Sequence, residues 1–347
     1  MIKRRSFLQS VTALTVGGQA FLRTGNLQAA VEEANQSTAS WPAMTYRRLG
    51  RTGFSGSRLV FGCGAALSNG KANDLLEPAL DAGINVFDVG YRNYYRDAEQ
   101  NLAPFLKRHR EKIFLISKAQ VEIDVEPAHE INAGEARQAA KNWTGFLEGS
   151  LRELRQDHVD AYYLMATNNV SVVRSEEIYR AFERAREAGK VTYFGISTHE
   201  NAENVLLAAA HSNWYDLAQI AITPAGWYDW ANRSILAGTA EMVSLRPTLE
   251  AAREAGIGLI GMKAGRYLAG RRFLGWGKPD AYNDYYDEPL MQSGLTAFQK
   301  SYAYVLEHGL DAVNADMQVW LHLQENFVAA ATSQQYFVDT IEVASRT

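Results

Sequence analysis

Short apolar runs alternate with segments of helical periodicity along most of the chain. Each run is four to six residues long and is bounded by polar residues or glycine, a pattern typical of buried parallel strands. Between the runs, apolar residues recur at helical spacing, for example in 73–82, 136–154, 176–188 and 245–255. The predicted strands are Leu59–Gly62, Asn85–Asp88, Ile113–Lys118, Val159–Leu164, Thr192–Ser197, Leu217–Ile222, Gly258–Lys263 and Leu310–Val313.

Eight strand–helix units of about thirty to forty residues each are typical of a (β/α)8 TIM barrel. A doubly wound sheet is the alternative, but no glycine-rich phosphate loop follows any predicted strand. Ahead of the first unit, a turn at Gly50–Gly53 joins two short strands, of which the second is Arg58–Phe61. We therefore expect an α/β fold, a (β/α)8 barrel with a short N-terminal β-hairpin, over residues 44–347.

The first thirty residues differ from the rest. The run Lys3–Leu8 (KRRSFL) resembles a twin-arginine export signal, and a basic N-terminal tail is the alternative. The weakly apolar segment Val11–Phe21 is too short to span a bilayer, and Ala29 and Ala30 offer a cleavage site. We expect a signal peptide over 1–30, a linker over 31–43, and export of the folded protein to the periplasm or beyond by the twin-arginine machinery.

Composition excludes several classes of function. The chain has 347 residues, 47% hydrophobic and 21% charged, with a net charge of -4, so nothing draws it generally to nucleic acid or to an anionic membrane. The single cysteine, Cys63, excludes an internal disulfide, an iron–sulfur cluster and a cysteine-rich zinc site. The seven histidines form no metal-binding motif. We expect no metal, no nucleic-acid partner and no stable membrane span.

Two charged residues end neighbouring predicted strands. Asp88 ends the second strand and Lys118 ends the third, so the two side chains should meet at one rim, about 5 Å apart in backbone terms. A buried lysine is costly unless it is paired. A desolvated Asp–Lys pair beside a tyrosine can lower the phenol pKa, so that the phenol donates a proton to a carbonyl. The alternatives are that Asp88 caps the next helix, or that the pair is purely structural.

One connection is much longer than the others, from residue 264 to 309. Its segment 275–289 holds Trp276, Tyr282, Tyr285 and Tyr286, which favours an ordered lid over the barrel mouth and a ligand that is apolar or sugar-like. A surface ornament without function is the alternative.

Residues 44–331 resemble the aldo-keto reductases. The resemblance rests on motifs whose order and spacing match along the chain: Tyr46–Gly53 (YRRLGRTG), Ile84–Asp88 (INVFD), Ile116–Lys118 (ISK), Val159–Leu164 (VDAYYL), Ala188–His199 (AGKVTYFGISTH), Gly261–Lys263 (GMK) and Glu325–Asn326 (EN). It implies a (β/α)8 barrel that binds nicotinamide dinucleotide across the strand ends. It also implies reduction of an aldehyde or ketone by a tetrad of Asp, Tyr, Lys and His.

The implied tetrad is incomplete in this chain. Asp88 and Lys118 match, but Asn93 stands at the tyrosine position. Tyr94 follows it directly and is our predicted proton donor, with Tyr91 and Tyr95 as alternatives. Met165 stands at the histidine position, and a thioether cannot donate a hydrogen bond to a carbonyl oxygen.

The implied cofactor contacts are also partial. Ser197 and Gln219 match the carboxamide contacts, with Thr198 in place of the family's Asn, and Trp227 or Tyr228 would have to supply the missing ring over the nicotinamide. Asp316, Met317 and His322 stand where the family grips the 2′-phosphate of NADP, and an acid there is repulsive, so NAD is favoured over NADP. The remaining predicted cofactor contacts are Lys263 and Arg266 at the pyrophosphate, and Glu325 and Asn326 at the adenosine.

Three hypotheses follow. The first is an exported aldo-keto reductase that acts on a small-molecule carbonyl substrate through Asp88, Tyr94 and Lys118. The second is a degenerate barrel that binds a small molecule without hydride transfer. The third is an accessory subunit docked on a redox partner or a membrane protein. Retention of Asp88 and Lys118 favours the first hypothesis, whereas Met165, Thr198 and Asp316 favour the second.

Overall fold

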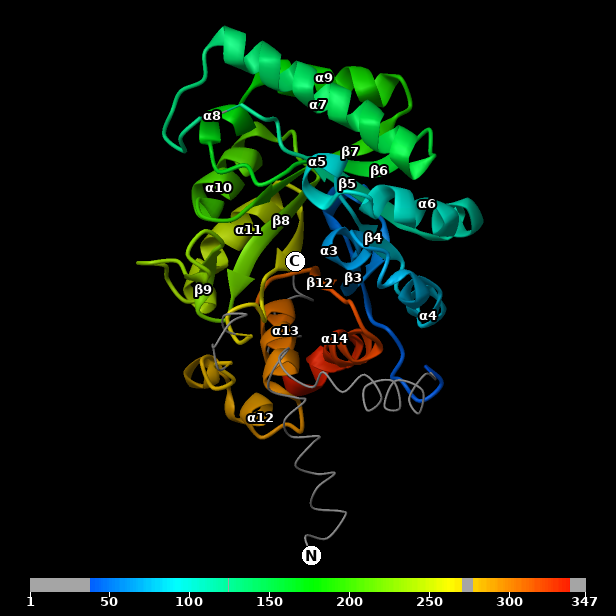
Figure 1. The fold of residues 1–347 in the computed structure, drawn as a ribbon. Helices are drawn as coiled ribbons and strands as arrows, with labels where there is room; N and C mark the ends of the chain where they lie inside the picture. Colours follow the sequence, from blue (N-terminus) through cyan, green and yellow to red (C-terminus); the bar gives the residue numbers. More distant parts are fainter. Residues whose placement is uncertain (1–37, 124, 270–276, 338–347) are drawn as a thin grey trace, which may run out of the picture.

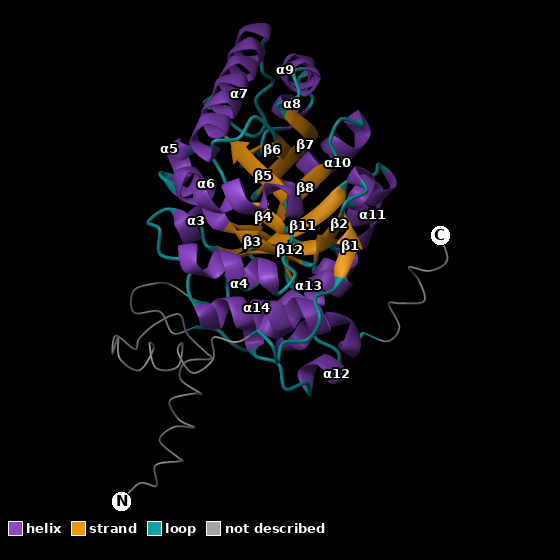
Figure 2. Ribbon diagram, turned by 90° about the vertical axis from the view of Figure 1, so that its right-hand side faces the viewer, coloured by secondary structure: helices purple, strands orange, loops and turns teal. Residues whose placement is uncertain are grey.

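A computed structural model describes residues 38–123, 125–269 and 277–337. Its centre is a closed barrel of eight parallel strands in which β7 pairs with β8, and the last strand pairs with the first (Figure 2). This confirms the predicted α/β barrel. The barrel strands, in order around the ring, are β3 (Leu59–Gly62), β4 (Val86–Asp88), β5 (Phe114–Ala119), β6 (Val159–Leu164), β7 (Val191–Thr198), β8 (Leu217–Thr223), β11 (Gly258–Met262) and β12 (Ala312–Asp316).

Helices surround the strands on the outside, as Figures 1 and 2 show. The longest, α7, buries an apolar stripe that includes Trp143 and Leu147. Its start is fixed by a capping box in which Asn132 and Glu135 bond each other's backbone N–H groups. The helices are α3 (Cys63–Leu67), α4 (Leu76–Asp81), α5 (Arg92–Tyr95), α6 (Ala98–His109), α7 (Ala133–Leu154), α8 (Val170–Val173), α9 (Glu176–Glu187), α10 (Ala202–Ser212), α11 (Arg246–Glu254), α12 (Glu288–Met291), α13 (Ala297–Glu307) and α14 (Trp320–Thr332).

The N-terminal hairpin closes the bottom of the barrel. It consists of β1 (Tyr46–Arg48) paired antiparallel with β2 (Ser55–Ser57), and it places Leu49 among the apolar side chains of the barrel interior. The prediction that Arg58–Phe61 is its second strand is wrong. The chain leaves the hairpin at Ser57 and enters the barrel directly, because the Arg58 side chain is buried between the carboxylate of Glu307 and the carbonyl of Leu306.

Strand alternation decides which side chains reach the top of the barrel. The lower interior is filled by Val60, Val86, Phe114, Ile116, Ala161, Tyr163, Leu217, Ile260 and Ala312. Side chains two residues further along a strand point to the same side. Each of these strands therefore places a polar side chain at the upper rim two residues after an apolar interior one: Asp88 after Val86, Lys118 after Ile116, and Gln219 after Leu217.

The last barrel strand lies two or three residues later than predicted. It runs over Ala312–Asp316 because the Asp311 carboxylate is used elsewhere, accepting from the backbone N–H of Leu259 and pairing with Arg253. An extra hairpin extends β8 and was not predicted. It consists of β9 (Gly226–Asp229) and β10 (Ser234–Ile235).

The predicted signal peptide and most of the predicted linker lie outside the described residues. At the described end of that linker, Trp41 packs against Trp320 and Phe327 of α14, with ring centroids 5.4 and 4.7 Å away. None of the helices in the described ranges is long and apolar enough to cross a membrane.

Candidate functional site

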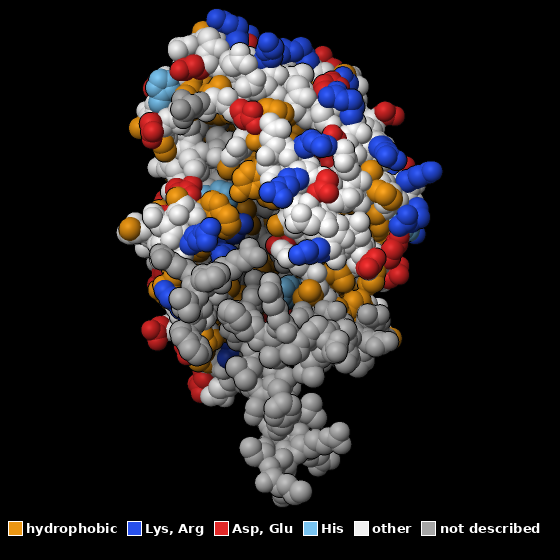
Figure 3. All heavy atoms as spheres, in the orientation of Figure 1, with side chains coloured by type: hydrophobic (Ala, Val, Ile, Leu, Met, Phe, Trp, Pro, Cys, Tyr) orange, Lys and Arg blue, Asp and Glu red, His pale blue; other side chains and the backbone are white. Residues whose placement is uncertain are grey.

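A cavity of about 620 Å³ opens at the carboxyl ends of the barrel strands. Every strand of the ring contributes a lining residue, either within the strand or directly after it: Gly62, Asp88, Lys118, Met165, Ser197, Gln219, Met262 and Asn314. All nine site residues predicted from the sequence line this one cavity, since Tyr94, Lys263, Arg266, Glu325 and Asn326 are also at its wall. On the face that Figure 3 shows, acidic and basic side chains are interspersed around the hollow near its middle.

Asp88 and Lys118 form a buried ion pair at the floor of the cavity. The Lys118 Nζ lies 2.6 and 2.5 Å from the two Asp88 carboxylate oxygens and 2.8 Å from the Val89 carbonyl oxygen. Both residues are 4% exposed, and the Asn314 amide donates to Asp88 as well. All three ammonium protons therefore have acceptors. Asp88 does not cap a helix, because α5 begins four residues later, behind Tyr91.

The tyrosine beside this pair is Tyr95. Its ring centroid lies 5.8 Å from the Lys118 Nζ, and its ring fills the space over Gly64 and Gly90. Tyr94 packs edge-on against Tyr95 and is 46% exposed, while the Tyr91 hydroxyl bonds the side chains of Gln120 and Glu122. The geometry thus favours Tyr95 over Tyr94 as the phenol next to the pair, and the role of Tyr94 stays a sequence-based prediction.

The Asp88–Lys118 pair does not acidify this phenol. Burial is the main cause that raises the pKa of Tyr95 above its usual range, and the Asp88 carboxylate raises it further. The expectation of a lowered phenol pKa is wrong for this geometry, because the charge of Lys118 is neutralised by Asp88. Tyr95 keeps its proton throughout the neutral pH range.

Two buried polar residues lie at the centre of the cavity wall. The Ser197 hydroxyl accepts from the backbone N–H of Ala166 at 2.9 Å. The Gln219 amide nitrogen contacts only the Met262 sulfur, at 3.8 Å, and its carbonyl oxygen has no hydrogen-bond partner within the described residues. A buried, unpartnered amide oxygen fits a ligand that carries an N–H donor, such as a carboxamide. Thr198 is fully buried, and its hydroxyl donates to Asn168 rather than into the cavity.

Charges of both signs lie at the far side of the cavity. Lys263 follows β11 and places its Nζ 4.2 Å from the centroid of the Trp230 ring. Burial lowers the pKa of Lys263 to about 8, opposed by the attraction of Asp316. Burial also raises the pKa of Asp316, whose carboxylate accepts from Gln318 at 2.8 Å. Glu325 accepts from the Thr296 hydroxyl, and its pKa is raised by burial as well.

Comparison with known proteins identifies the chain's relatives. The sequence model of the aldo/keto reductase family matches residues 54–312, which is most of the chain. The chain belongs to the aldo/keto reductase family. It is 28% identical over 243 residues to the uncharacterized oxidoreductase YrpG of Bacillus subtilis, covering 66% of this chain and 69% of YrpG.

Solved structures agree on the fold. A putative aldo-keto reductase from Pseudomonas aeruginosa superposes with a TM-score of 0.60 at 21% identity, covering 86% of this chain and 99% of that one. An aldo-keto reductase from Bacillus halodurans, in its holo form, superposes with a TM-score of 0.59 at 19% identity, covering 86% and 96%. The family relationship also makes this chain an oxidoreductase in general type, and the family generally uses NAD(P)H.

This family member places Met165 where the resemblance implies a histidine. Met165 is 6% exposed and lines the cavity with its thioether. His199, just beyond β7, lines the same cavity, and its ring makes no hydrogen bond within the described residues. Burial, followed by the charge of Lys263, lowers the pKa of His199 to about 3, so the imidazole is neutral. Sequence reasoning missed His199, although its place directly after the Ser197–Thr198 strand end marked it.

The aromatic residues of the cavity also differ from those expected. Trp227 and Tyr228 are buried within β9 and do not line the cavity, so the expectation that either covers a nicotinamide is wrong. Trp230, at the tip of the β9–β10 hairpin, lines the cavity instead. The predicted lid is ordered over residues 277–289, with Tyr282 buried against Leu268, but none of these residues lines the cavity. Trp276 lies outside the described residues.

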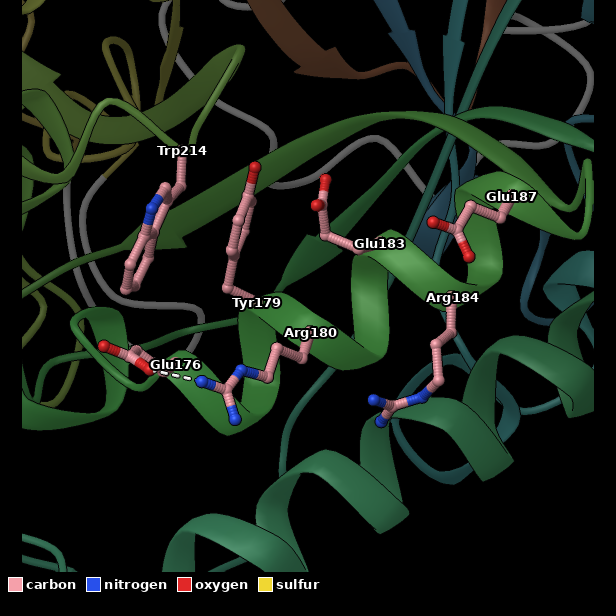
Figure 4. A pocket seen from close by; sticks show the side chains of 7 residues that line it. All are labelled: Glu176, Tyr179, Arg180, Glu183, Arg184, Glu187 and Trp214. Atoms are coloured by element: carbon pink, nitrogen blue, oxygen red, sulfur yellow. Dashed lines mark hydrogen bonds and ion pairs between the residues drawn. The ribbon is translucent and has the colours of Figure 1, made fainter.

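A second hollow lies away from the barrel mouth, on the outer side of α9 (Figure 4). Tyr179 stacks on Trp214 in its wall, with ring centroids 4.7 Å apart, and the rest of the wall is formed by arginines and glutamates of α9. It brings together no group suited to catalysis. Within the described ranges, no cluster of three His, Cys, Asp or Glu side chains could hold a metal ion.

Proposed function

We propose that this aldo/keto reductase reduces an aldehyde or ketone to an alcohol with a nicotinamide cofactor, at the cavity above the Asp88–Lys118 pair. The observation that carries the proposal is that buried pair, lying at the cavity floor with the Tyr95 ring 5.8 Å from its ammonium. A barrel without catalysis gains nothing from a desolvated charge pair at its mouth, since such pairs seldom stabilise a fold.

The cofactor site is supported by the polar groups of the cavity wall. The unpartnered Gln219 oxygen and the Ser197 hydroxyl suit a carboxamide, while Lys263 and Arg266 supply positive charge for a pyrophosphate. The chemistry that a nicotinamide supplies when bound is hydride transfer. Glu325 and Asn326 line the adenosine end that the family resemblance implies.

The chain's own residues handle the proton. Tyr95 holds its proton at neutral pH and is placed to donate it to the oxygen of a carbonyl group as that oxygen gains charge. Lys118 neutralises the Asp88 carboxylate and so offsets the repulsion that this carboxylate would exert on the phenolate that the donation leaves. Asp88 holds Lys118 in place, and Asn314 in turn donates to Asp88.

The cofactor we propose is NAD rather than NADP. Asp316 lies at the cavity wall, where the resemblance implies the 2′-phosphate contacts, and Glu325 adds a second carboxyl group nearby. Two acids repel a phosphate monoester, whereas the 2′-hydroxyl of NAD can donate to a carboxylate.

We also propose that the protein is exported in the folded state by the twin-arginine machinery and acts in the periplasm. This rests on the run Lys3–Leu8 alone. Export after folding would let the cofactor be bound in the cytoplasm first.

The test is cofactor binding followed by turnover, using the full chain. Quenching of tryptophan fluorescence by NADH reports binding, because Trp230 lines the cavity, and Trp230→Phe should remove most of the change if binding is there. Micromolar binding of NADH, with oxidation of NADH in the presence of a panel of aldehydes and ketones, supports the proposal. Absence of binding at millimolar NADH and NADPH contradicts it.

One observation favours a second function, a barrel that binds a small molecule without reducing it. The three protons of Lys118 are all taken by Asp88 and Val89, so none is left for the Tyr95 hydroxyl. Tight binding of a small carbonyl compound without turnover, in protein that also fails to bind NADH, would support this alternative.

A further inference from the structure

Two lysines line the cavity, and their surroundings are opposite. Lys118 is saturated, with three acceptors for its three protons. Lys263 has no hydrogen bond and no ion pair from its Nζ within the described residues, and its Nζ lies 4.2 Å from the centroid of the Trp230 ring. An amine whose lone pair can be freed toward a cavity is a potential nucleophile, whereas one locked by a carboxylate is not.

The backbone holds Lys263 in an unusual conformation. Its φ is 69°, in the left-handed region that non-glycine residues seldom occupy. A turn closed by the Arg266 N–H on the Lys263 carbonyl at 2.8 Å fixes this geometry. Such strained residues are concentrated at functional sites, where the surrounding structure aims the side chain.

Burial, and not the surrounding charges, favours the neutral form of Lys263. Arg266 from the same loop and Lys118 across the barrel both disfavour the ammonium, and Asp316 and Asp88 oppose them. Burial outweighs the two acids and brings the pKa of Lys263 to about 8, so roughly a tenth of Lys263 is free amine at pH 7. An ordinary exposed lysine has roughly one free amine in 2,500 at that pH.

Lys278 provides an internal comparison. Its Nζ lies over the ring of Tyr267 at the same distance of 4.2 Å, but the side chain is exposed and also bonds the Tyr267 hydroxyl at 2.7 Å. The contact with an aromatic face is therefore shared by both lysines. Burial at a cavity wall distinguishes Lys263.

We propose that Lys263 is a nucleophilic amine that captures a small aldehyde or unhindered ketone in this cavity as an imine. The free amine attacks the carbonyl carbon and gives a carbinolamine after a proton moves from nitrogen to oxygen. Loss of one water then gives the imine. No oxidant or reductant enters this step, since amine and carbonyl combine to imine plus water.

This inference is independent of the proposed reduction. Lys263 is also a candidate contact for the cofactor's pyrophosphate, so a dinucleotide and an imine compete for the same nitrogen. The covalent site therefore belongs to protein without dinucleotide, and NADH should protect Lys263 wherever the proposed cofactor site is real.

The experiment is reductive trapping in the full chain. Protein is incubated at pH 7 with propanal and cyanoborohydride, the external reductant that converts an imine into a stable secondary amine, and the modified lysines are found by peptide mass spectrometry. We expect propyl labelling of Lys263 to exceed that of Lys278 by roughly tenfold or more. Equal labelling of the two lysines, or no labelling of Lys263, overturns the proposal.

Two variants make the result specific. Lys263→Arg keeps the positive charge but removes the primary amine, so this variant should lose the fast-labelled site. Lys278→Arg should leave the labelling of Lys263 unchanged. Circular dichroism checks that both are folded. Protection by NADH supports both proposals, while fast labelling without NADH binding supports the imine site and contradicts the reductase. If the protein binds NADH but Lys263 stays unlabelled in the absence of cofactor, the reductase is supported and the imine site is contradicted.

Discussion

Single residues at the cavity floor set what this barrel can do. Asp88 and Lys118 could be placed from the sequence because each ends an apolar run, and parallel strands bring their ends to one rim. The sequence did not show which tyrosine lies beside them, because α5 turns Tyr94 outward and Tyr95 inward within a single helical turn. Spacing along a sequence does not fix the direction of such a short helix.

Replacing Lys118 tests the catalytic role at this scale. Lys118→Met should reduce turnover by a hundredfold or more, on the order of 3 kcal/mol in transition-state stabilisation. It also leaves Asp88 buried with Asn314 as its remaining partner, which should destabilise the fold by about 3–5 kcal/mol.

A double variant separates the two effects. Asp88→Asn combined with Lys118→Met removes both charges, so stability in urea should largely return while turnover stays lost. Turnover that returns together with stability would contradict a chemical role for Lys118.

Asp316 tests the cofactor preference. Asp316→Lys replaces repulsion by attraction at the cavity wall and should tighten NADPH binding at least about tenfold relative to NADH. Asp316→Asn, which only removes the charge, should give a smaller change in the same direction. Fluorescence titration of the three proteins measures both, and an unchanged ratio of the two affinities would mean that no 2′-phosphate approaches this residue.

At the scale of elements, the N-terminal hairpin closes the bottom of the barrel and packs closely against β11. Gly50 has a φ of 50°, and a Cβ there would lie 2.2 Å from the Gly258 nitrogen, at the bottom of β11. The sequence marked the turn by its glycines, but it did not reveal that the hairpin strand ends at Ser57, because β2 and β3 are separated by one residue.

The two glycines of this turn form a matched pair of variants. Gly50→Ala adds a clash with backbone to an unfavourable φ and should lower the free energy of unfolding by more than about 2 kcal/mol. Gly53→Ala has the unfavourable φ of 73° without the clash, since its nearest neighbour is 3.7 Å away, and should lower it by about 1 kcal/mol. Urea midpoints measure both, and equal losses would show that the hairpin is not seated on β11.

The helices and strands were predictable because each keeps its apolar period over a full element, as in α7 and β8. The β9–β10 hairpin was not, because its four-residue strand is buried on both faces and shows no alternation. That hairpin carries Trp230 to the cavity wall, so the missed element accounts for the missed aromatic residue.

At the scale of the whole molecule, stability should depend on pH through Glu99. This residue of α6 is 1% exposed; one carboxylate oxygen accepts from Ser117 at 2.6 Å, and the other has no partner within the described residues. Burial raises its pKa from 4.5 to about 7. Between these values the unfolded chain loses its proton while the folded one keeps it, so stability falls as pH rises and levels off above 7.

The size of this fall is on the order of 3 kcal/mol. Glu99→Gln keeps an acceptor for Ser117 but cannot ionise, so it should remove the fall and leave a variant more stable than the native protein at pH 8. Denaturation in urea at pH 5 and pH 8 measures it. Glu187→Gln, at an exposed position of α9, is the control and should leave the pH dependence as it is. A native protein equally stable at both pH values would contradict a protonated Glu99.

The pairing of β12 with β3 joins residues about 250 positions apart, Asp316 with Gly62. During synthesis the ring cannot close until the last strand has left the ribosome, and until then β3 and β11 present open edges to other chains. Such long-range closure is slow compared with the formation of single strand–helix units. A chain that ends before residue 312 should therefore aggregate rather than form a smaller barrel.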